Sequence, residues 1–193
     1  NRFMKKTLVV FAHPYLEHSN SNAELINFYV RHQHFTLRDL YEEYPNFHIA
    51  AFRERKRIQN YERFIFQFPL IWFGMPPLLK LWIDEVFDRD WLKEGNQNPL
   101  QGKDVYILVT TGGKERSFHR QGTYKFTVEE LISGLVVSLN VFKADIKKPP
   151  LPQAGSMIVS SGLGCIIATQ KSITGSGVKN CPRPSFSWWD KNF

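Results

Sequence analysis

The sequence is poor in cysteine and has no long apolar run. Its 193 residues include two cysteines, Cys165 and Cys181, whose spacing fits neither a zinc site nor a redox dithiol. We therefore expect no disulfide framework, no catalytic thiol and no bound metal. No stretch approaches the roughly 20 apolar residues that a membrane span needs. Lys5 and Lys6 lead directly into a strand-like run rather than into a signal peptide, so we expect a cytoplasmic protein.

The net positive charge is also small over most of the chain, although the formal net charge of the whole chain is +7. Residues 1–146 carry a net +2, and residues 147–193 carry the remaining +5. A nucleic-acid-binding domain usually presents its positive charge as a patch on the folded body. Because most of the excess lies near the end of the chain, we expect no nucleic-acid partner.

Two glycine-rich phosphate-binding motifs are absent. The sequence contains neither the G-x-G-x-x-G dinucleotide fingerprint nor the G-x-x-x-x-G-K-[ST] loop of P-loop NTPases. Any phosphate group must therefore be held in another way.

The sequence does contain the alternating pattern of a single α/β domain. Hydrophobic residues make up 42% of the chain and aromatic residues 15%, enough for a sizeable core. Short apolar, β-branched runs alternate with stretches of helical periodicity. The expected strands are residues 7–12, 35–40, 64–68, 105–111 and 141–146, and the expected helices are residues 23–32, 50–61, 77–87 and 126–139. This alternation favours a parallel sheet with right-handed crossovers.

The unusual residues follow the first, third and fourth expected strands. In a flavodoxin-like sheet of strand order 2-1-3-4-5, a ligand crevice opens at the carboxyl ends of strands one and three. We therefore expect three loops to meet at one cofactor site. The residues expected to bind the cofactor are His13, Ser19, Asn20, Ser21 and Asn22 in the first loop, Pro69, Leu70, Ile71, Trp72 and Phe73 in the second, and Thr110, Thr111, Gly112 and Gly113 in the third.

The first of these loops is suited to a phosphate monoester. His13, Ser19 and Asn22 offer donors just before a helix amino terminus, where the helix dipole and free N–H groups favour an anion. An alternative is that Ser19, Ser21 and Asn22 only cap the helix. Ser21 with Glu24 has the spacing of a capping box. The sequence leaves both interpretations open.

The other two loops are suited to a planar ring. Glycine allows close approach of a ligand to the backbone of the Thr110–Gly113 loop, and free N–H groups there favour negative charge on a bound ring. A diglycine after a strand is also an ordinary turn. Trp72 and Phe73 lie at a strand end, where a flat heterocycle would bind. Trp82, further along, is expected to pack against the sheet or a partner subunit.

Five motifs in order resemble the NAD(P)H:quinone oxidoreductases, particularly the small bacterial branch with the ancillary flavoprotein of glutathione-gated potassium efflux systems. The motifs are HP-x-x-x-x-S-x-x-N from His13, DLY-x-x-YP-x-F from Asp39, P-x-x-WF-x-x-P-x-x-LK-x-W-x-D-x-V from Pro69, L-x-GK from Leu100 and TTGG from Thr110. They cover roughly residues 6–150, and the segment from Pro69 is the most specific.

The resemblance implies a flavodoxin-like three-layer α/β fold, bound FMN, NADH or NADPH as electron donor, a quinone-like small acceptor and a homodimer. It places the FMN phosphate near His13, Ser19 and Asn22 and the isoalloxazine beside Leu70–Phe73 and Thr110–Gly113. The alternative that it implies is a regulatory flavoprotein in peripheral contact with a membrane potassium transporter.

The chain departs from the resemblance at two places. Many relatives have a tyrosine a few residues beyond TTGG that contacts the acceptor pocket, whereas this chain has Phe118, with His119 and Tyr124 close by. We expect these three residues to form the catalytic side of the site. Beyond about Pro152 the sequence no longer resembles the family. We therefore expect a flavodoxin-like FMN-binding domain over residues 1–152 and an atypical tail over residues 153–193.

Overall fold

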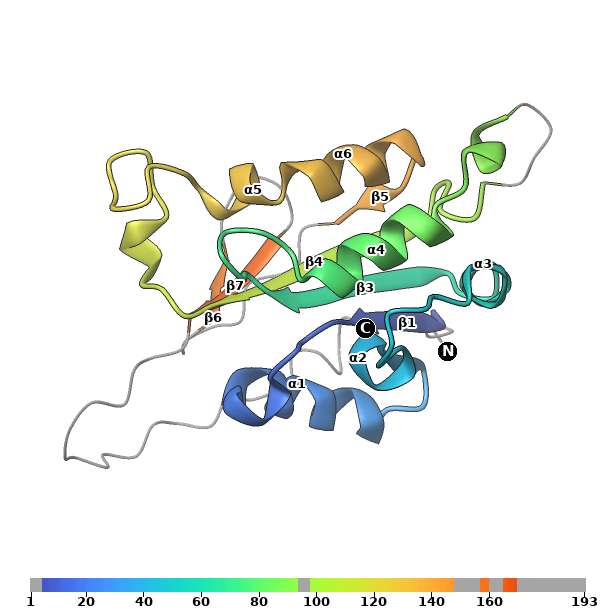
Figure 1. Ribbon diagram of the computed structural model, residues 1–193, viewed down its shortest axis with the longest axis horizontal. Coiled ribbons are helices and arrows are strands. Elements are labelled where there is room, and N and C mark those ends of the chain that lie inside the picture. Colours follow the sequence, from blue (N-terminus) through green and yellow to red (C-terminus); the bar gives the residue numbers. More distant parts are fainter. Residues whose placement is uncertain (1–4, 94–97, 148–156, 160–164, 170–193) are drawn as a thin grey trace.

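The computed structural model describes residues 5–93, 98–147, 157–159 and 165–169. Five strands that pair in parallel make up the first part of its sheet: β1 (Thr7–Phe11), β2 (Phe35–Asp39), β3 (Arg63–Pro69), β4 (Asp104–Thr111) and β5 (Asp145–Ile146). Their order is β2-β1-β3-β4, with β5 beside β4 (Figure 1). The predicted flavodoxin-like strand order 2-1-3-4-5 is confirmed. β1 and β4 are buried along their whole length, as expected for parallel strands covered on both faces.

The edge beyond β4 is shared by β5 and β7. β5 pairs only with Asp104 and Val105, and β7 (Cys165–Thr169) pairs in parallel with Ile107–Thr111. A further strand, β6 (Met157–Val159), lies antiparallel to β7. Both strands come from the segment that we expected to be an atypical tail. The boundary between the two segments, at residue 152, stays a prediction.

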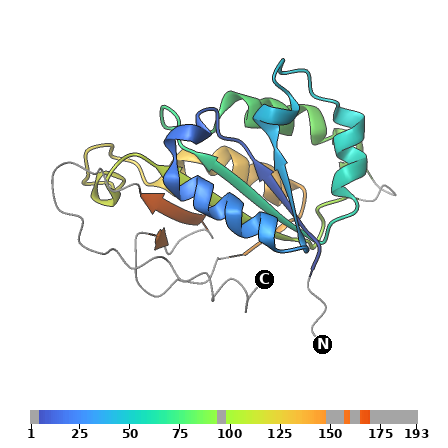
Figure 2. The same cartoon turned by 90° about the horizontal axis from the view of Figure 1, so that it is seen from below.

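Helices cover both faces of the sheet (Figures 1 and 2). One face carries α1 (Asn20–Arg31), which lies in front of the strands in Figure 2. The other face carries α2 (Leu40–Glu43), α3 (Ala51–Ile58), α4 (Pro77–Val86), α5 (Val128–Leu131) and α6 (Ser133–Val141). Short 3-10 turns occur at η1 (Leu16–His18), η2 (Arg89–Leu92) and η3 (Glu115–Ser117).

The predicted helix over residues 126–139 and the strand after it need correction. The helix is divided into α5 and α6 at Ile132. α6 then continues to Val141, and Phe142 and Lys143 form a turn, so only Asp145 and Ile146 of the strand expected over residues 141–146 are extended. Leu139 and Phe142 are buried in the core, and this packing outweighs the strand preference of β-branched Val141.

Each face of the sheet has its own hydrophobic core. Phe28 and Tyr29 of α1 pack with Val9, Phe11 and Ile65 on one side. The larger core on the other side joins alternate residues of β1, β3 and β4 to the five remaining helices. The strands are therefore packed on both faces, and this packing positions the loops at their carboxyl ends.

α4 is anchored by a buried polar contact as well as by apolar packing. The helix begins at Pro77, a residue favoured in the first turn. Trp82 is fully buried, and its Nε1 donates to Oε2 of Glu54 at 3.2 Å. Tyr44 and Arg38 donate to Oε1 of the same carboxylate, at 2.8 and 3.0 Å. This group fixes α4 and, with it, the loop that joins β3 to α4.

Candidate functional site

The loop after β1 presents His13 with a defined tautomer. The backbone N–H of Tyr15 donates to Nδ1 of His13 at 3.1 Å. Nδ1 is therefore unprotonated, and the hydrogen of the neutral ring lies on Nε2. Burial lowers the pKa of His13, and the nearby charge of Glu17 opposes this shift only in part. His13 is thus a neutral donor through Nε2, and its ring lies 6.2 Å from that of Phe11.

Ser19, rather than Ser21, precedes the first residue of α1. The predicted capping box of Ser21 and Glu24 is wrong, because α1 begins at Asn20 and both residues lie inside the helix. Ser19 occupies the N-cap position but makes no side-chain capping bond. Its Oγ instead accepts from Nδ2 of Asn22 at 2.9 Å. The side chains of Asn20 and Ser21, two expected cofactor contacts, lie outside the described part of the structure.

Asn22 is the centre of a buried hydrogen-bond network. Its Nδ2 donates to Oγ1 of Thr110 at 3.1 Å as well as to Ser19, and its Oδ1 accepts from Nε2 of Gln67 at 2.8 Å. Oε1 of Gln67 in turn accepts from the hydroxyl of Tyr29 at 2.7 Å. The network joins the loop after β1 to the carboxyl ends of β3 and β4.

The loop after β3 makes a strained two-residue turn. Backbone N–H and C=O groups of Ile71 and Gly74 are paired in both directions, at 2.9 and 3.1 Å. Trp72 and Phe73 fill the two central positions with φ of 47° and 65°. Positive φ is costly for bulky L-residues, and two-residue turns of this kind usually contain Asn or Gly. Trp72 is 91% exposed, so its own packing does not explain the strain.

The loop after β4 is held against the β3 loop. Leu70 N–H donates to the carbonyl of Thr110 at 2.8 Å, and Pro69 pairs with Thr110 in the sheet. Space is open around Gly112, where an added Cβ would meet nothing within 4 Å. A Cβ on Gly113 would lie 2.9 Å from Cε2 of Phe118. The two glycines therefore have different surroundings: one faces open space, and the other faces an aromatic ring.

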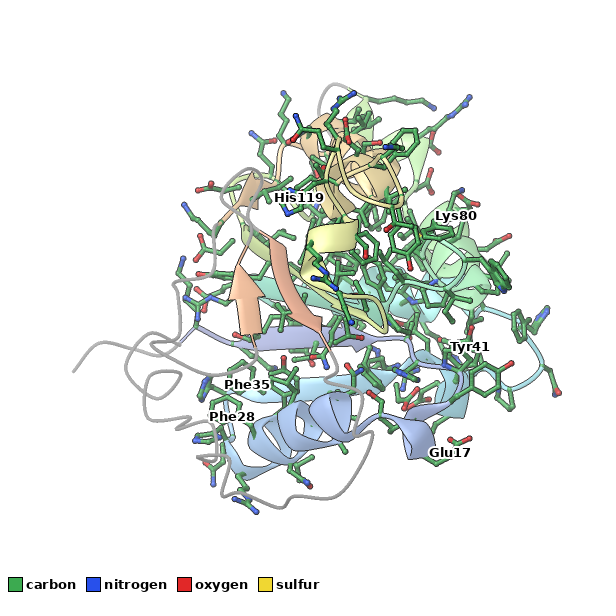
Figure 3. The ribbon with its side chains drawn as sticks, turned by 90° about the vertical axis from the view of Figure 1, so that its left-hand side faces the viewer. Glu17, Phe28, Phe35, Tyr41, Lys80 and His119 are labelled. Atoms are coloured by element: carbon green, nitrogen blue, oxygen red, sulfur yellow. The ribbon has the colours of Figure 1, made fainter. Side chains whose placement is uncertain are left out.

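The three expected catalytic residues lie in different environments. Phe118 is buried in the core, with its ring against Gly113. Tyr124 is half-buried, and its ring contacts those of Phe118 and Phe73, with centroids 4.9 Å apart in each pair. His119 is exposed. Figure 3 looks onto the carboxyl edge of the sheet and shows His119 above the strand ends and Glu17 below them.

The donors at this edge suit an anion beside a flat ring. No described residue accepts a hydrogen bond from the hydroxyl of Ser19 or Thr110, or from the backbone N–H of Phe73 or Gly113. These groups and Nε2 of His13 are donors, which match phosphate oxygens and the carbonyl oxygens of an isoalloxazine. In the described ranges, His, Cys, Asp and Glu form no group of three or more that can hold a metal ion.

Two members of the site, Gln67 and Tyr29, were not predicted from the sequence. Gln67 is fully buried in the centre of β3, and Tyr29 is buried in α1. A glutamine between Phe66 and Phe68 was the available signal, since a polar side chain in a buried strand must find hydrogen-bond partners. Trp82, by contrast, packs against the sheet as one of our two alternatives expected.

Comparison with known sequences identifies relatives over the same region. A family model described as flavodoxin-like fold matches residues 5–149. The NAD(P)H oxidoreductase YrkL of Bacillus subtilis is 37% identical over 135 residues, which are 70% of this chain and 78% of YrkL. KefF of Enterobacter sp., an ancillary protein of a glutathione-regulated potassium-efflux system, is 40% identical over 111 residues, 58% of this chain and 63% of KefF.

Solved structures also align with most of this chain. General stress protein 14 of Treponema denticola, in complex with FMN, aligns with a TM-score of 0.69 and 29% identity, covering 74% of this chain and 82% of that one. An NADPH-quinone reductase of P. pentosaceus aligns with a TM-score of 0.65 and 29% identity, covering 73% and 80%. Within the described ranges, no helix has both the length and the hydropathy to cross a membrane. The family match over residues 5–149 and the similarity to YrkL show that the chain belongs to the flavodoxin-like fold family, which also contains these NAD(P)H oxidoreductases.

Proposed function

We propose that the chain is an FMN-dependent oxidoreductase that uses NADH or NADPH to reduce a quinone or a similar small acceptor. One NAD(P)H, one proton and one quinone give NAD(P)⁺ and one hydroquinone. The observation that carries the proposal is the meeting of the three loops at the carboxyl edge of β1, β3 and β4, each with donors that no described residue accepts from. The FMN complex of general stress protein 14 supports the choice of cofactor.

His13 and Ser19 would hold the phosphate. The hydroxyl of Ser19 and Nε2 of His13 are donors near the amino terminus of a 12-residue helix, where the helix dipole adds to the attraction for an anion. A compact monophosphate site fits FMN, and the chain has no pyrophosphate fingerprint that would favour FAD.

The loops after β3 and β4 would hold the ring. Backbone N–H groups of Phe73 and Gly113 would stabilise negative charge on a flat heterocycle without reorganisation. The open space at Gly112 allows the ring to approach the backbone closely. A bound flavin supplies the hydride and electron chemistry, while the protein supplies orientation and electrostatics.

The acceptor would bind beside the aromatic side chains of the same loops. Trp72 is exposed at the tip of the β3 turn, and Tyr124 lies against Phe73. Flat apolar rings favour a quinone-like acceptor by stacking. We propose further that the protein is a cytoplasmic homodimer, in line with the motif resemblance.

The kinetics with NADPH and a soluble quinone test this function. Donor and acceptor would use one ring face in turn, so initial rates should give parallel double-reciprocal lines. Intersecting lines would contradict the alternating use of one site. A protein that binds FMN but turns over neither NADH nor NADPH with any quinone would instead favour a regulatory flavoprotein, the alternative that the similarity to KefF supports. Direct binding to membranes that contain a potassium-efflux transporter would then test that alternative.

A further inference from the structure

Three buried residues from two elements, α1 and β3, form one continuous relay of hydrogen bonds. Tyr29 of α1, Gln67 of β3 and Asn22 in the first turns of α1 are each at most 1% exposed. The hydroxyl of Tyr29 donates to Oε1 of Gln67, and Nε2 of Gln67 donates to Oδ1 of Asn22. Each amide therefore has its oxygen on one side and its nitrogen on the other, in one orientation.

The hydroxyl of Tyr29 sets the orientation of the amide groups of Gln67 and Asn22. Burial raises the pKa of Tyr29 well above its ordinary value, so its hydroxyl keeps its hydrogen and serves as a donor. Among the described residues, Oε1 of Gln67 at 2.7 Å is the one hydrogen-bond acceptor of this buried hydroxyl, so Nε2 of Gln67 is turned toward Asn22. The oxygen of Asn22 then faces Gln67, and both Nδ2 hydrogens point to Ser19 and Thr110.

Asn22 thus fixes the hydrogen-bonding direction of two hydroxyl groups. A hydroxyl has one hydrogen, and the oxygens of Ser19 and Thr110 each accept a hydrogen from Asn22. The hydrogen of each hydroxyl must therefore point elsewhere. Ser19 is 9% exposed and Thr110 8%, and no described residue accepts a hydrogen bond from either hydroxyl.

We propose that the relay of Tyr29, Gln67 and Asn22 positions the hydroxyls of Ser19 and Thr110 as donors to bound FMN, Ser19 to the phosphate and Thr110 to the ring. The relay residues act through these hydroxyls and do not themselves touch the cofactor. Asn22, whose two amide hydrogens are used inside the protein, is a positioning residue rather than a phosphate ligand. This inference rests on the proposed use of FMN.

Replacing Gln67 by leucine removes the link that orients Asn22. The amide of Asn22 can then turn its oxygen toward Ser19 and Thr110 and accept from their hydroxyls, which withdraws both donors from the cofactor. Loss of a hydrogen bond to a charged phosphate should weaken FMN about tenfold to a hundredfold. Riboflavin, which lacks the phosphate, should be weakened only severalfold. The ratio of the two dissociation constants is therefore the informative readout.

The experiment measures FMN and riboflavin binding to the full-length apoproteins by flavin fluorescence, together with denaturant melts. Tyr29→Phe is the second variant, because it removes one hydroxyl and keeps the ring in the core. Tyr44→Phe is the matched control: it makes the same chemical change in the buried group around Glu54, which shares no described hydrogen bond with Ser19, Asn22 or Thr110. Ser19→Ala gives the size of the effect when the phosphate donor itself is removed.

We expect Gln67→Leu and Tyr29→Phe to weaken FMN more than riboflavin, in the same sense as Ser19→Ala, and Tyr44→Phe to lower stability without changing either affinity. An unchanged FMN affinity in both relay variants would overturn the inference and leave the proposed function standing. Equal weakening of FMN and riboflavin would also overturn it, since that is the result of general loosening. A wild-type protein that binds no FMN would contradict the proposed function, and the inference with it.

Discussion

The ring of Phe73 lies against the ring of Tyr124, with centroids 4.9 Å apart and planes inclined by 62°. The contact joins the tip of the loop after β3 to the loop after β4. Tyr124 also contacts Phe118, which in turn fills the space beside Gly113. The two loops that would enclose a flavin ring therefore contact each other through side chains. They are also joined by the backbone hydrogen bond from Leu70 N–H to the carbonyl of Thr110.

Tyr124 should matter chiefly through its ring. Tyr124→Ala removes two aromatic contacts, each worth about 0.5–1.5 kcal/mol, so the free energy of unfolding should fall by about 1–3 kcal/mol. The KM for a quinone should rise as the two loops separate. Tyr124→Phe keeps both contacts and should retain the stability and FMN affinity of the wild type. Urea melts and flavin titrations of both variants test this, and a phenylalanine variant as unstable as the alanine variant would contradict it.

Gly112 and Gly113 should respond differently to the same substitution. Gly112→Ala places a methyl group in open space, so stability should change by less than about 0.5 kcal/mol, while FMN binding weakens because the ring loses its close approach. Gly113→Ala forces the methyl group against Phe118 and should cost about 1–3 kcal/mol of stability.

A substitution of Phe118 tests whether overlap with its ring is the cause of the cost expected for Gly113→Ala. Combining Gly113→Ala with Phe118→Leu removes the overlap, so the double variant should be more stable than the sum of its single changes predicts. Strict additivity would show that the two positions do not press on each other. Normal FMN binding by Gly112→Ala would place the ring elsewhere.

Trp72 should store backbone strain in the free protein. Its positive φ costs a bulky residue about 1 kcal/mol, and glycine avoids this cost. Since the side chain is 91% exposed, Trp72→Gly loses little packing, and the apoprotein should become more stable. Phe73→Gly serves as the comparison, because it also relieves strain but loses the contact with Tyr124. Thermal melts showing that Trp72→Gly is less stable than the wild type would reject stored strain at this turn.

His13 should give the apoprotein a pH-dependent stability just below neutrality. Burial lowers its folded-state pKa, while the unfolded chain has the ordinary value of 6.5. Between these two values the unfolded state binds more protons, so the free energy of unfolding falls as the pH drops below 6.5. The fall ends below the folded-state pKa. In denaturant melts from pH 5 to 8, the free energy of unfolding should depend less steeply on pH in His13→Asn than in the wild type. The same pH dependence in both proteins would contradict a lowered pKa of His13.

The strands and most helices were predictable because local patterns and the fold agree. The mainly apolar runs at β1, β3 and β4 indicate strands buried on both faces, and Pro77 marks the start of α4. The expected fifth strand began four residues too early, because α6 extends to Val141 and the buried side chains of Leu139 and Phe142 decide the conformation there. The pairing of β7 with β4 joins segments more than 50 residues apart, and no local pattern indicates such a partner.

The site was predictable in outline and not in its details. Strand order alone brings Ser19, Trp72 and Thr110 to one edge of the sheet. The proposed division of roles between Ser19 and Asn22 depends on which hydrogens are already used inside the protein. Only the folded structure reveals that Gln67 lies between Asn22 and Tyr29. For the same reason, the burial of Phe118 behind Gly113 is not evident from their spacing.

The flavin content of the purified protein, followed by its anaerobic reduction, tests the central claim most directly. Denaturation should release FMN, identified by chromatography, and the holoprotein should lose its flavin absorbance when NADPH or NADH is added without oxygen. Recovery of FAD alone, no flavin after incubation with excess FMN, or bound FMN that neither nucleotide reduces would contradict an FMN-dependent NAD(P)H oxidoreductase.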